Sequence, residues 1–260
     1  MGLFFGNYEL VVSNYILTSL VIFNNMNRQN MACPLLEQAS ELPLIAAPSS
    51  DLSISVHHLA EALGEAVDIK DPYTHHHSQE VAVISLLLAR ALDLDEDSCS
   101  AIHIAGHLHD LGKIGVSDGI LTKNGALTAL EWVEMRRHPI YGFDILRQIP
   151  GLTARNGIAE MVLCHHECFD GSGYPQGLKG RAIPLGGRIL AVADMVSAMA
   201  SRRSYREPRT WPDIFDEVER VNGAQLDPFT VEAFFKVSER IREWLLGGER
   251  ETPAKALADA

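Results

Sequence analysis

The sequence predicts an all-α protein, and three observations support this prediction. Apolar residues recur with helical spacing through most of the chain, whereas no stretch alternates polar and apolar residues for long. Several helical segments start at residues that cap helix N-termini. Of the 260 residues, 47% are hydrophobic and 22% are charged, which is typical of a globular domain and excludes an extended disordered chain.

Nine helices are expected along the chain. They cover residues 52–67, 76–92, 96–110, 128–137, 140–149, 154–166, 187–201, 210–222 and 228–246. Capping side chains precede four of these segments: Asp51 or Ser53, Asp95, Thr128 with Glu131 as a capping box, and Thr210.

The composition also predicts the domain organisation. Residues 29–50 are rich in proline and serine and are expected to form a linker, so residues 1–50 form an N-terminal extension. The domain then covers residues 51–246, and residues 247–260 form a frayed tail. Two connections, Leu111–Gly125 and Asp170–Gly187, are rich in glycine and proline, and loops of this length tend to be functional.

Charge and cysteine content restrict the partners and the compartment. The 22 basic and 34 acidic residues give a net charge of −12, which argues against a general nucleic-acid or anionic-membrane surface. Four cysteines are too few for a disulfide framework in a chain of this size, so we expect a reducing, cytoplasmic compartment. They are Cys33, Cys99, Cys164 and Cys168.

One apolar stretch, residues 10–23, raises the question of a membrane. It is shorter than the roughly 20 residues that a spanning helix needs, and no basic residue precedes it as in a signal peptide. We expect an amphipathic helix or the remnant of an upstream segment, with a membrane contact as the alternative.

Histidines and aspartates at helix ends indicate a metal site. His109 and Asp110 end an apolar helix, and adjacent helical positions point about 100° apart, so both side chains can reach one cavity. His138 and the pair His165-His166 stand at other helix ends, and Asp194 lies in an apolar run where its burial demands a cation or several donors. Such nitrogen and oxygen donors suit divalent metals, and two ions bridged by a carboxylate hydrolyse phosphate esters.

Two motifs resemble those of a known family. HDLGKIG, at His109–Gly115, resembles the HD superfamily of metal-dependent phosphohydrolases. HHECFDGSGYPQGLKG, at His165–Gly180, resembles the HD-GYP subfamily, whose namesake triplet stands at residues 173–175. Further motifs follow the family's order over residues 71–228. The resemblance implies a single multi-helix HD-type bundle with long functional loops.

The resemblance also implies a set of site residues and two divalent metal ions, Fe or Mn. The metal ligands would be His77, His109, Asp110, Asp194, His138, His165 and His166, with Asp110 bridging the ions and His166 either a ligand or close behind one. Lys113 would contact the scissile phosphate and act with Asp110 in catalysis. Arg203 and Arg206 would bind phosphate oxygens, and Tyr174 would line the nucleotide pocket.

The implied activity is hydrolysis of cyclic di-GMP to the linear dinucleotide by a metal-bridging hydroxide, in bacterial second-messenger signalling. Residues 179–209 carry seven basic and two acidic residues, which gives a net charge of +5 where an anionic substrate needs it. Two alternatives remain: hydrolysis of another cyclic dinucleotide, such as one containing adenine, and a catalytically weak module that binds the dinucleotide or docks onto signalling proteins.

Two positions depart from the family pattern. Tyr73 stands where some members carry a glutamate that helps to bind a third metal, so two metals are expected. Ser197 replaces the second aspartate of an Asp-x-x-Asp pattern, so a supporting hydrogen bond or charge is expected to be missing. His75 and His76 are expected to lie outside the ligand positions, and His57 and His58 to be surface or helix-packing residues. His103 and His107 have the i, i+4 spacing that can chelate a metal, but they are expected to be a structural pair or to support a ligand. Cys164 and Cys168 are a poor zinc site.

Overall fold

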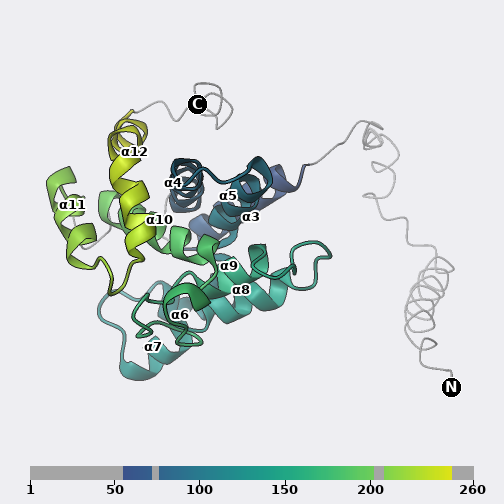
Figure 1. The fold of residues 1–260 in the computed structure, drawn as a ribbon. Helices are drawn as coiled ribbons and strands as arrows, with labels where there is room; N and C mark the ends of the chain where they lie inside the picture. Colours follow the sequence, from purple (N-terminus) through teal and green to yellow (C-terminus); the bar gives the residue numbers. More distant parts are fainter. Residues whose placement is uncertain (1–54, 72–75, 202–207, 248–260) are drawn as a thin grey trace, which may run out of the picture. The chain divides into compact units, whose positions relative to one another are not determined.

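A computed structural model describes residues 55–71, 76–201 and 208–247. Within these ranges the protein consists of helices and loops without a strand, which confirms the predicted all-α class (Figure 1). The expected extension at residues 1–50 and the apolar stretch at residues 10–23 lie outside the described residues. No helix in the described ranges is long and apolar enough to cross a membrane.

Each of the nine expected segments overlaps a helix. The α-helices are α3 Val56–Lys70, α4 His77–Ala91, α5 Glu96–Leu108, α6 Asp118–Leu121, α7 Ala129–Met135, α8 His138–Leu146, α9 Ile158–Cys164, α10 Leu185–Ala200, α11 Trp211–Arg220 and α12 Pro228–Leu246. Two 3-10 helices, η2 Leu111–Gly115 and η3 Gly180–Ala182, and the four-residue α6 were not expected. They are too short for apolar periodicity to reveal them.

The helix N-termini follow the expected capping chemistry at three of four places. Asp95 accepts a hydrogen bond from the backbone of Ser98, and Thr128 forms the expected capping box. Thr210 forms a second capping box. The first helix begins later than expected, because Ser55, rather than Asp51 or Ser53, caps α3 by accepting from the His58 backbone N–H.

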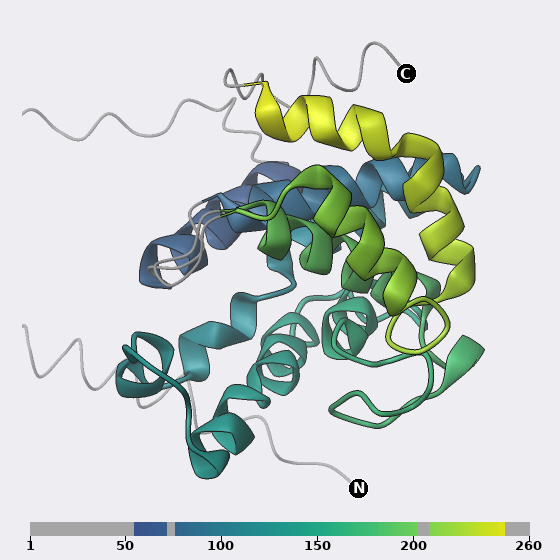
Figure 2. The same cartoon turned by 90° about the vertical axis from the view of Figure 1, so that its left-hand side faces the viewer.

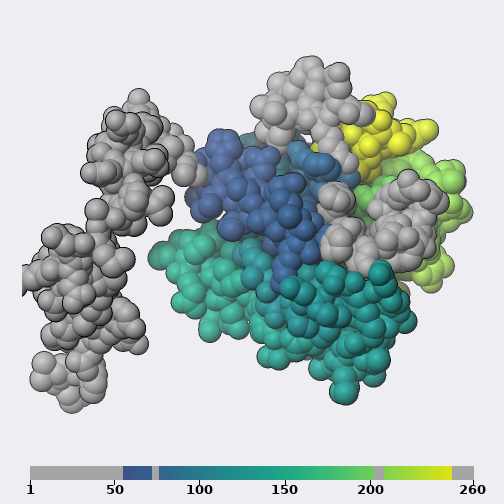
Figure 3. Space-filling model, turned by 180° about the vertical axis from the view of Figure 1, so that it is seen from behind, coloured from purple at the N-terminus to yellow at the C-terminus, as the bar shows by residue number. Residues whose placement is uncertain are grey.

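Helix α4 lies at the centre of the bundle and packs against α3, α5, α10 and α12. It is apolar on nearly all sides, and side chains such as Ile84 and Leu88 are fully buried against residues such as Leu190 of α10 and Phe234 of α12. In Figures 1 and 2, the segment from α6 to α8 lies below the α3–α5 layer, and Figure 3 shows it from behind as the lower part of the surface. Because α4 is buried on nearly all sides, it lies inside the bundle and not at its surface.

Five helices contribute an end or an inner face to one region of this bundle. His77 is the first residue of α4, and His109 directly follows α5. His138 begins α8, His165 directly follows α9, and Asp194 lies on α10. The fold therefore brings together polar residues that are far apart in the sequence.

A close approach of η2 and α8 places two of these residues side by side. A Cβ atom on Gly112 would overlap the carbonyl oxygen of His138, so only glycine permits this packing. Since Asp110 directly precedes η2, the approach places its carboxylate beside the His138 ring.

Candidate metal centre

Six of the seven predicted ligands form two groups of three. His77, His109 and Asp194 make up one group, and the second consists of His138, His165 and His166. Within each group, one nitrogen or oxygen atom from every residue lies within 4.8 Å of the others.

The carboxylate of Asp110 lies between the two groups. Its Oδ2 atom is 3.3 Å from His109 Nε2 and 3.9 Å from His77 Nε2. Its Oδ1 atom is 3.3 Å from His138 Nε2. One oxygen therefore faces each group, which is the placement that a carboxylate bridging two ions requires.

Backbone carbonyls fix the orientation of three of these histidines. The Nδ1–H groups of His109 and His138 each donate to a carbonyl three residues earlier at 2.8 Å, and that of His165 does so at 2.6 Å. A carbonyl only accepts, so Nδ1 carries the proton and Nε2 presents its lone pair to the site. Metal-ligating histidines are usually held in this way.

His77 is oriented by a different partner. Its Nδ1 lies 2.8 Å from Oγ of Ser197, and that hydroxyl donates to a carboxylate oxygen of Glu80 at 2.7 Å. Ser201 donates to the same oxygen at 2.6 Å. The expectation that Ser197 leaves a supporting hydrogen bond missing is therefore wrong, because the serine accepts from His77 and Glu80 supplies the negative charge behind it.

The electrostatics of the site favour a cation. Burial keeps the pKa of His138 at about 3, so its ring is neutral at pH 7 and can act as a ligand. Burial alone would lower the pKa of His109, but the neighbouring carboxylates of Asp110 and Asp194 raise this pKa to about 9. His109 Nε2 is buried and makes no hydrogen bond to the residues that the structure describes, although Asp110 lies 3.3 Å away. A buried ring nitrogen beside two carboxylates, whose negative charge favours a bound cation, fits a divalent metal ion.

Lys113 is held by two carboxylates. Its ammonium group lies 2.7 Å from Asp110 and 2.8 Å from Asp71, the residue that follows α3. These two charges outweigh burial and raise the pKa of Lys113 above its usual range. Lys70, the last residue of α3, donates to the carbonyls of Ile114 at 3.1 Å and Val116 at 3.2 Å. The end of α3 therefore positions the loop that carries Lys113.

A cavity of about 860 Å³ opens over the metal centre. Side chains of the predicted site line it, namely His77, Asp110, Lys113, His138, His166, Tyr174 and Asp194, together with Asp71. The lining is completed by Ile120, Leu121, residues 123–127, Trp132, Met135 and Ala198. The sequence analysis assigned no role to Lys123 or Trp132. Of these two residues, Lys123 could have been found from the sequence, because it belongs to the Leu-Thr-Lys motif at residues 121–123.

The Gly-Tyr-Pro loop folds back onto the histidine pair. The Tyr174 backbone N–H donates to the His166 carbonyl at 3.1 Å, and the Tyr174 and His166 ring centroids are 4.9 Å apart. Glu167 accepts hydrogen bonds from the backbone N–H groups of Gln176 at 2.7 Å and of Leu178 at 3.0 Å. A Cβ on Gly173 would lie 2.5 Å from Cα of Glu167, so the loop requires glycine there. Sequence reasoning missed this role of Glu167.

An arginine packs against two aromatic rings that line the cavity. The guanidinium of Arg136 lies 5.2 Å from the Tyr174 ring centroid and 6.0 Å from that of Trp132. These distances are within cation–π range, so the three side chains form one cluster.

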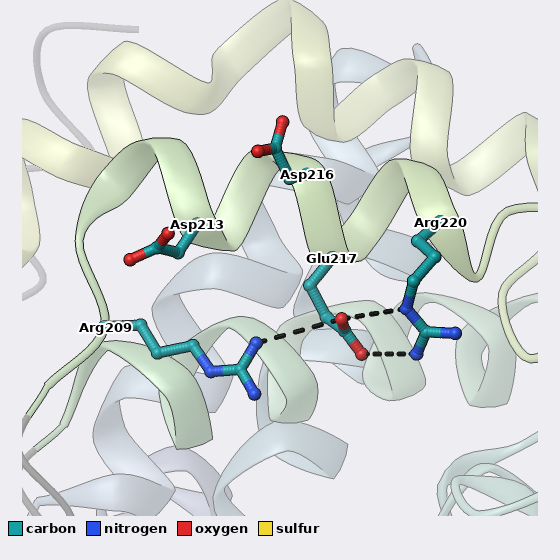
Figure 4. Close-up of a pocket in the computed structure, with 5 residues that line it drawn as sticks. All are labelled: Arg209, Asp213, Asp216, Glu217 and Arg220. Carbon is teal, nitrogen blue, oxygen red and sulfur yellow. Dashed lines mark hydrogen bonds and ion pairs between the residues drawn. The ribbon is translucent and has the colours of Figure 1, made fainter.

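The basic segment is only partly described. Arg203 and Arg206 lie outside the described residues, as do Tyr73 and His75. Arg188 is paired with Asp227 at 2.5 Å. Arg209 lies in a surface hollow on α11, where Glu217 faces both Arg209 at 3.8 Å and Arg220 at 2.6 Å (Figure 4). Arg188 and Arg209 are thus engaged in ion pairs and do not line the cavity.

Fold and site together define a helical domain with a candidate histidine-aspartate metal centre. The model of the HD domain family matches residues 61–229, and the chain belongs to this family. The resemblance to the HD-GYP subfamily predicted from the sequence is confirmed.

Two relatives and one solved structure illustrate the similarity. A cyclic di-GMP phosphodiesterase of Thermotoga maritima is 42% identical over 183 residues, which cover 70% of this chain and 50% of that protein. The 3′3′-cGAMP-specific phosphodiesterase 2 of Vibrio cholerae is 38% identical, covering 70% of this chain and 35% of that protein. The crystal structure of a cyclic GMP-AMP specific phosphodiesterase of V. cholerae matches with a TM-score of 0.57 and 19% identity, over 74% of this chain and 51% of that one. The chain thus spans half or less of the length of the two curated relatives.

Proposed function

We propose that this chain is a phosphodiesterase that hydrolyses cyclic di-GMP to the linear dinucleotide. The observation that carries the proposal is the position of Asp110, whose two carboxylate oxygens face two histidine-containing groups at the base of a cavity. The relative from T. maritima, which is named for this activity, supports the choice of substrate.

Two divalent ions, Fe or Mn, are the proposed cofactors. His77, His109 and Asp194 would bind one ion and His138, His165 and His166 the other, with Asp110 shared between them. Two ions held in this way supply a nucleophile derived from water and stabilise the charge that develops on the phosphate. Because Tyr73 cannot replace a carboxylate, we propose two ions per chain rather than three.

Lys113 is proposed to neutralise charge on the scissile phosphate. Its ammonium group lines the cavity and is already oriented by Asp71 and Asp110. A charge held in place before the reaction costs no reorganisation as negative charge develops on the substrate. Arg203 and Arg206 are proposed to bind phosphate oxygens farther from the metals.

The aromatic wall of the cavity is proposed to bind the nucleotide. Tyr174 and Trp132 offer ring faces for a base, and Arg136 lies close to both rings. A volume of about 860 Å³ falls in the range of about 300–1,000 Å³ that small-molecule sites occupy. The cavity is therefore large enough to enclose most of a dinucleotide.

The substrate could instead be another cyclic dinucleotide. The V. cholerae relative named as specific for 3′3′-cGAMP is 38% identical to this chain, close to the 42% of the T. maritima protein. Identity at this level does not separate guanine from adenine, because a few contacts to the base edge decide between them.

The proposed setting is the cytoplasm, with signalling proteins as partners. The three described cysteines, Cys99, Cys164 and Cys168, are free thiols, and cysteines that stay reduced are typical of the cytoplasm.

A substrate comparison tests the proposed function. The chain is purified without oxygen, its metals are measured by elemental analysis, and cyclic di-GMP, 3′3′-cGAMP and cyclic di-AMP are each assayed for hydrolysis. We expect the highest kcat/KM for cyclic di-GMP. A higher value for either other dinucleotide would assign the alternative substrate, and metal-loaded protein that binds but hydrolyses none would assign a binding module.

A further inference from the structure

A third histidine cluster lies outside the proposed metal centre, between α3 and α5. His57 is in the first turn of α3, and His103 and His107 are one turn apart on α5. One ring nitrogen from each lies within 4.8 Å of the others, and the ring centroids are 4.9–5.4 Å apart. None of the three lines the cavity over the metal centre.

The hydrogen bonds around His103 show which of its nitrogens is available. Its Nδ1 lies 3.0 Å from the carbonyl oxygen of Ala82 on α4, so Nδ1 donates and Nε2 carries a lone pair. That lone pair accepts a hydrogen bond from His57 Nε2 at 2.9 Å, so a bound metal ion would require the His57 proton to move to Nδ1. A backbone carbonyl behind the ring is the usual partner of a metal-ligating histidine.

The third member, His107, has an unsatisfied nitrogen. The side chain is 1% exposed, and its Nε2 makes no hydrogen bond to the residues that the structure describes. A buried polar atom without a partner is costly, and such atoms are rare in folded proteins. Its neighbours here are two imidazoles, each with a ring nitrogen within 4.8 Å of one of its own.

We propose that His57, His103 and His107 bind a divalent transition-metal ion, such as Zn²⁺, separately from the catalytic metals. Imidazole nitrogens suit this class of ion, and three histidines with water as the fourth ligand make a tetrahedral site. Nitrogens bound to Zn²⁺ at about 2.0–2.1 Å stand about 3.3 Å apart. His57 must therefore withdraw by a few tenths of an ångström, which its position in the half-exposed first turn of α3 permits.

The charges around the cluster allow this binding. Burial, with smaller effects of His57 and Arg90, lowers the pKa of His103 to about 4, so its ring is neutral at pH 7. The positive charge of Arg90 opposes a bound cation, and its ion pair with Glu96 at 3.8 Å offsets part of that repulsion. A bound ion would connect α3 to α5, so Zn²⁺ should raise the melting temperature by binding only the folded state.

The test compares two neighbouring histidines of α3. His57→Ala removes one proposed ligand, whereas His58→Ala removes a ring that bonds to Ser55 and does not belong to the cluster. The metal-free full-length chain and both variants are loaded with Zn²⁺, separated from unbound ion by gel filtration and analysed for zinc content. We expect wild type and His58→Ala to retain one zinc ion per chain more than His57→Ala, and to gain more in melting temperature from zinc.

In His57→Ala, the affinity of the two remaining histidines for zinc should fall by more than roughly 10–100-fold. That range is the cost of losing only a hydrogen-bond partner behind a ligand, whereas this variant loses a ligand itself. If circular dichroism shows that His57→Ala does not fold, His57→Gln takes its place. Equal zinc content in wild type and the folded His57 variant would overturn the proposal. Because the result is a difference between variants, it does not depend on whether the catalytic centre binds metal or hydrolyses a dinucleotide.

Discussion

Replacing Ser197 with alanine tests how the structure holds His77 in place. Ser197 is fully buried and its Oγ lies 2.8 Å from His77 Nδ1, while His77 is only 4% exposed. The alanine variant leaves a buried N–H without its acceptor, which costs about 1–3 kcal/mol. At about 1.4 kcal/mol per tenfold change, this cost corresponds to roughly 5–150-fold in affinity.

Loss of a hydrogen-bond partner behind a metal-ligating histidine typically costs about 10–100-fold in metal affinity, which agrees with this range. We therefore expect Ser197→Ala to bind Mn²⁺ about 10–100-fold more weakly than wild type, measured by competition with a chelator that reports free metal. Hydrolysis of cyclic di-GMP should recover when Mn²⁺ is raised.

Ser201 provides the matched control. It donates to the same oxygen of Glu80 at 2.6 Å, whereas His77 Nδ1 bonds to Ser197, so Ser201→Ala disturbs Glu80 without removing the acceptor of His77. Its Mn²⁺ affinity should stay within a few-fold of wild type. If Ser197→Ala binds Mn²⁺ as tightly as the control, the hydrogen bond does not orient a ligand and our reasoning about His77 is refuted.

Four further substitutions separate metal binding from substrate binding. Asp110→Ala should lose most of the bound metal and all hydrolysis, because it removes the carboxylate proposed to be shared by both ions; full metal content with normal turnover would contradict the two-metal assignment. Replacing Arg203 or Arg206 with alanine should leave metal content unchanged and weaken substrate binding by about 1–3 kcal/mol, the value of a charge-assisted hydrogen bond. Wild-type kcat/KM in both arginine variants would disprove the proposed phosphate contact. Gly173→Ala should raise KM for the dinucleotide more than it lowers metal affinity, because a Cβ 2.5 Å from Cα of Glu167 displaces the loop that carries Tyr174; an unchanged KM would show that the loop accommodates the methyl group.

Apolar periodicity predicted the helices well because each long helix buries one face or more. It could not reveal α6, which spans only Asp118–Leu121 and has too few residues to repeat a pattern. The cap of the first helix was placed too early, because Ser55 and the two upstream candidates have similar capping chemistry. Only the position of α3 in the bundle decides which of them is used.

The site was predictable where motifs were local and less so where it depends on packing. The His109-Asp110 pair is one motif, so its place at a helix end was visible in the sequence. The support of His77 by Ser197 and Glu80 was not visible there, because Ser197 is more than 100 positions away from both His77 and Glu80 in the chain. The meeting of His57 with His103 likewise depends on how α3 packs against α5.

The attachment of Lys113 to the end of α3 has a mechanical consequence. A helix moves as a rigid rod, and one residue of helix corresponds to about 1.5 Å along its axis. A slide of α3 by this amount away from Lys113 would lengthen the 2.8 Å contact between Asp71 and Lys113 beyond hydrogen-bonding distance and would weaken the bonds of Lys70 to the carbonyls that it contacts. Asp110 would then be the remaining carboxylate on the ammonium group. The position of this group therefore depends partly on a helix whose first turn is about 20 Å away, and a displacement applied there would reach the cavity.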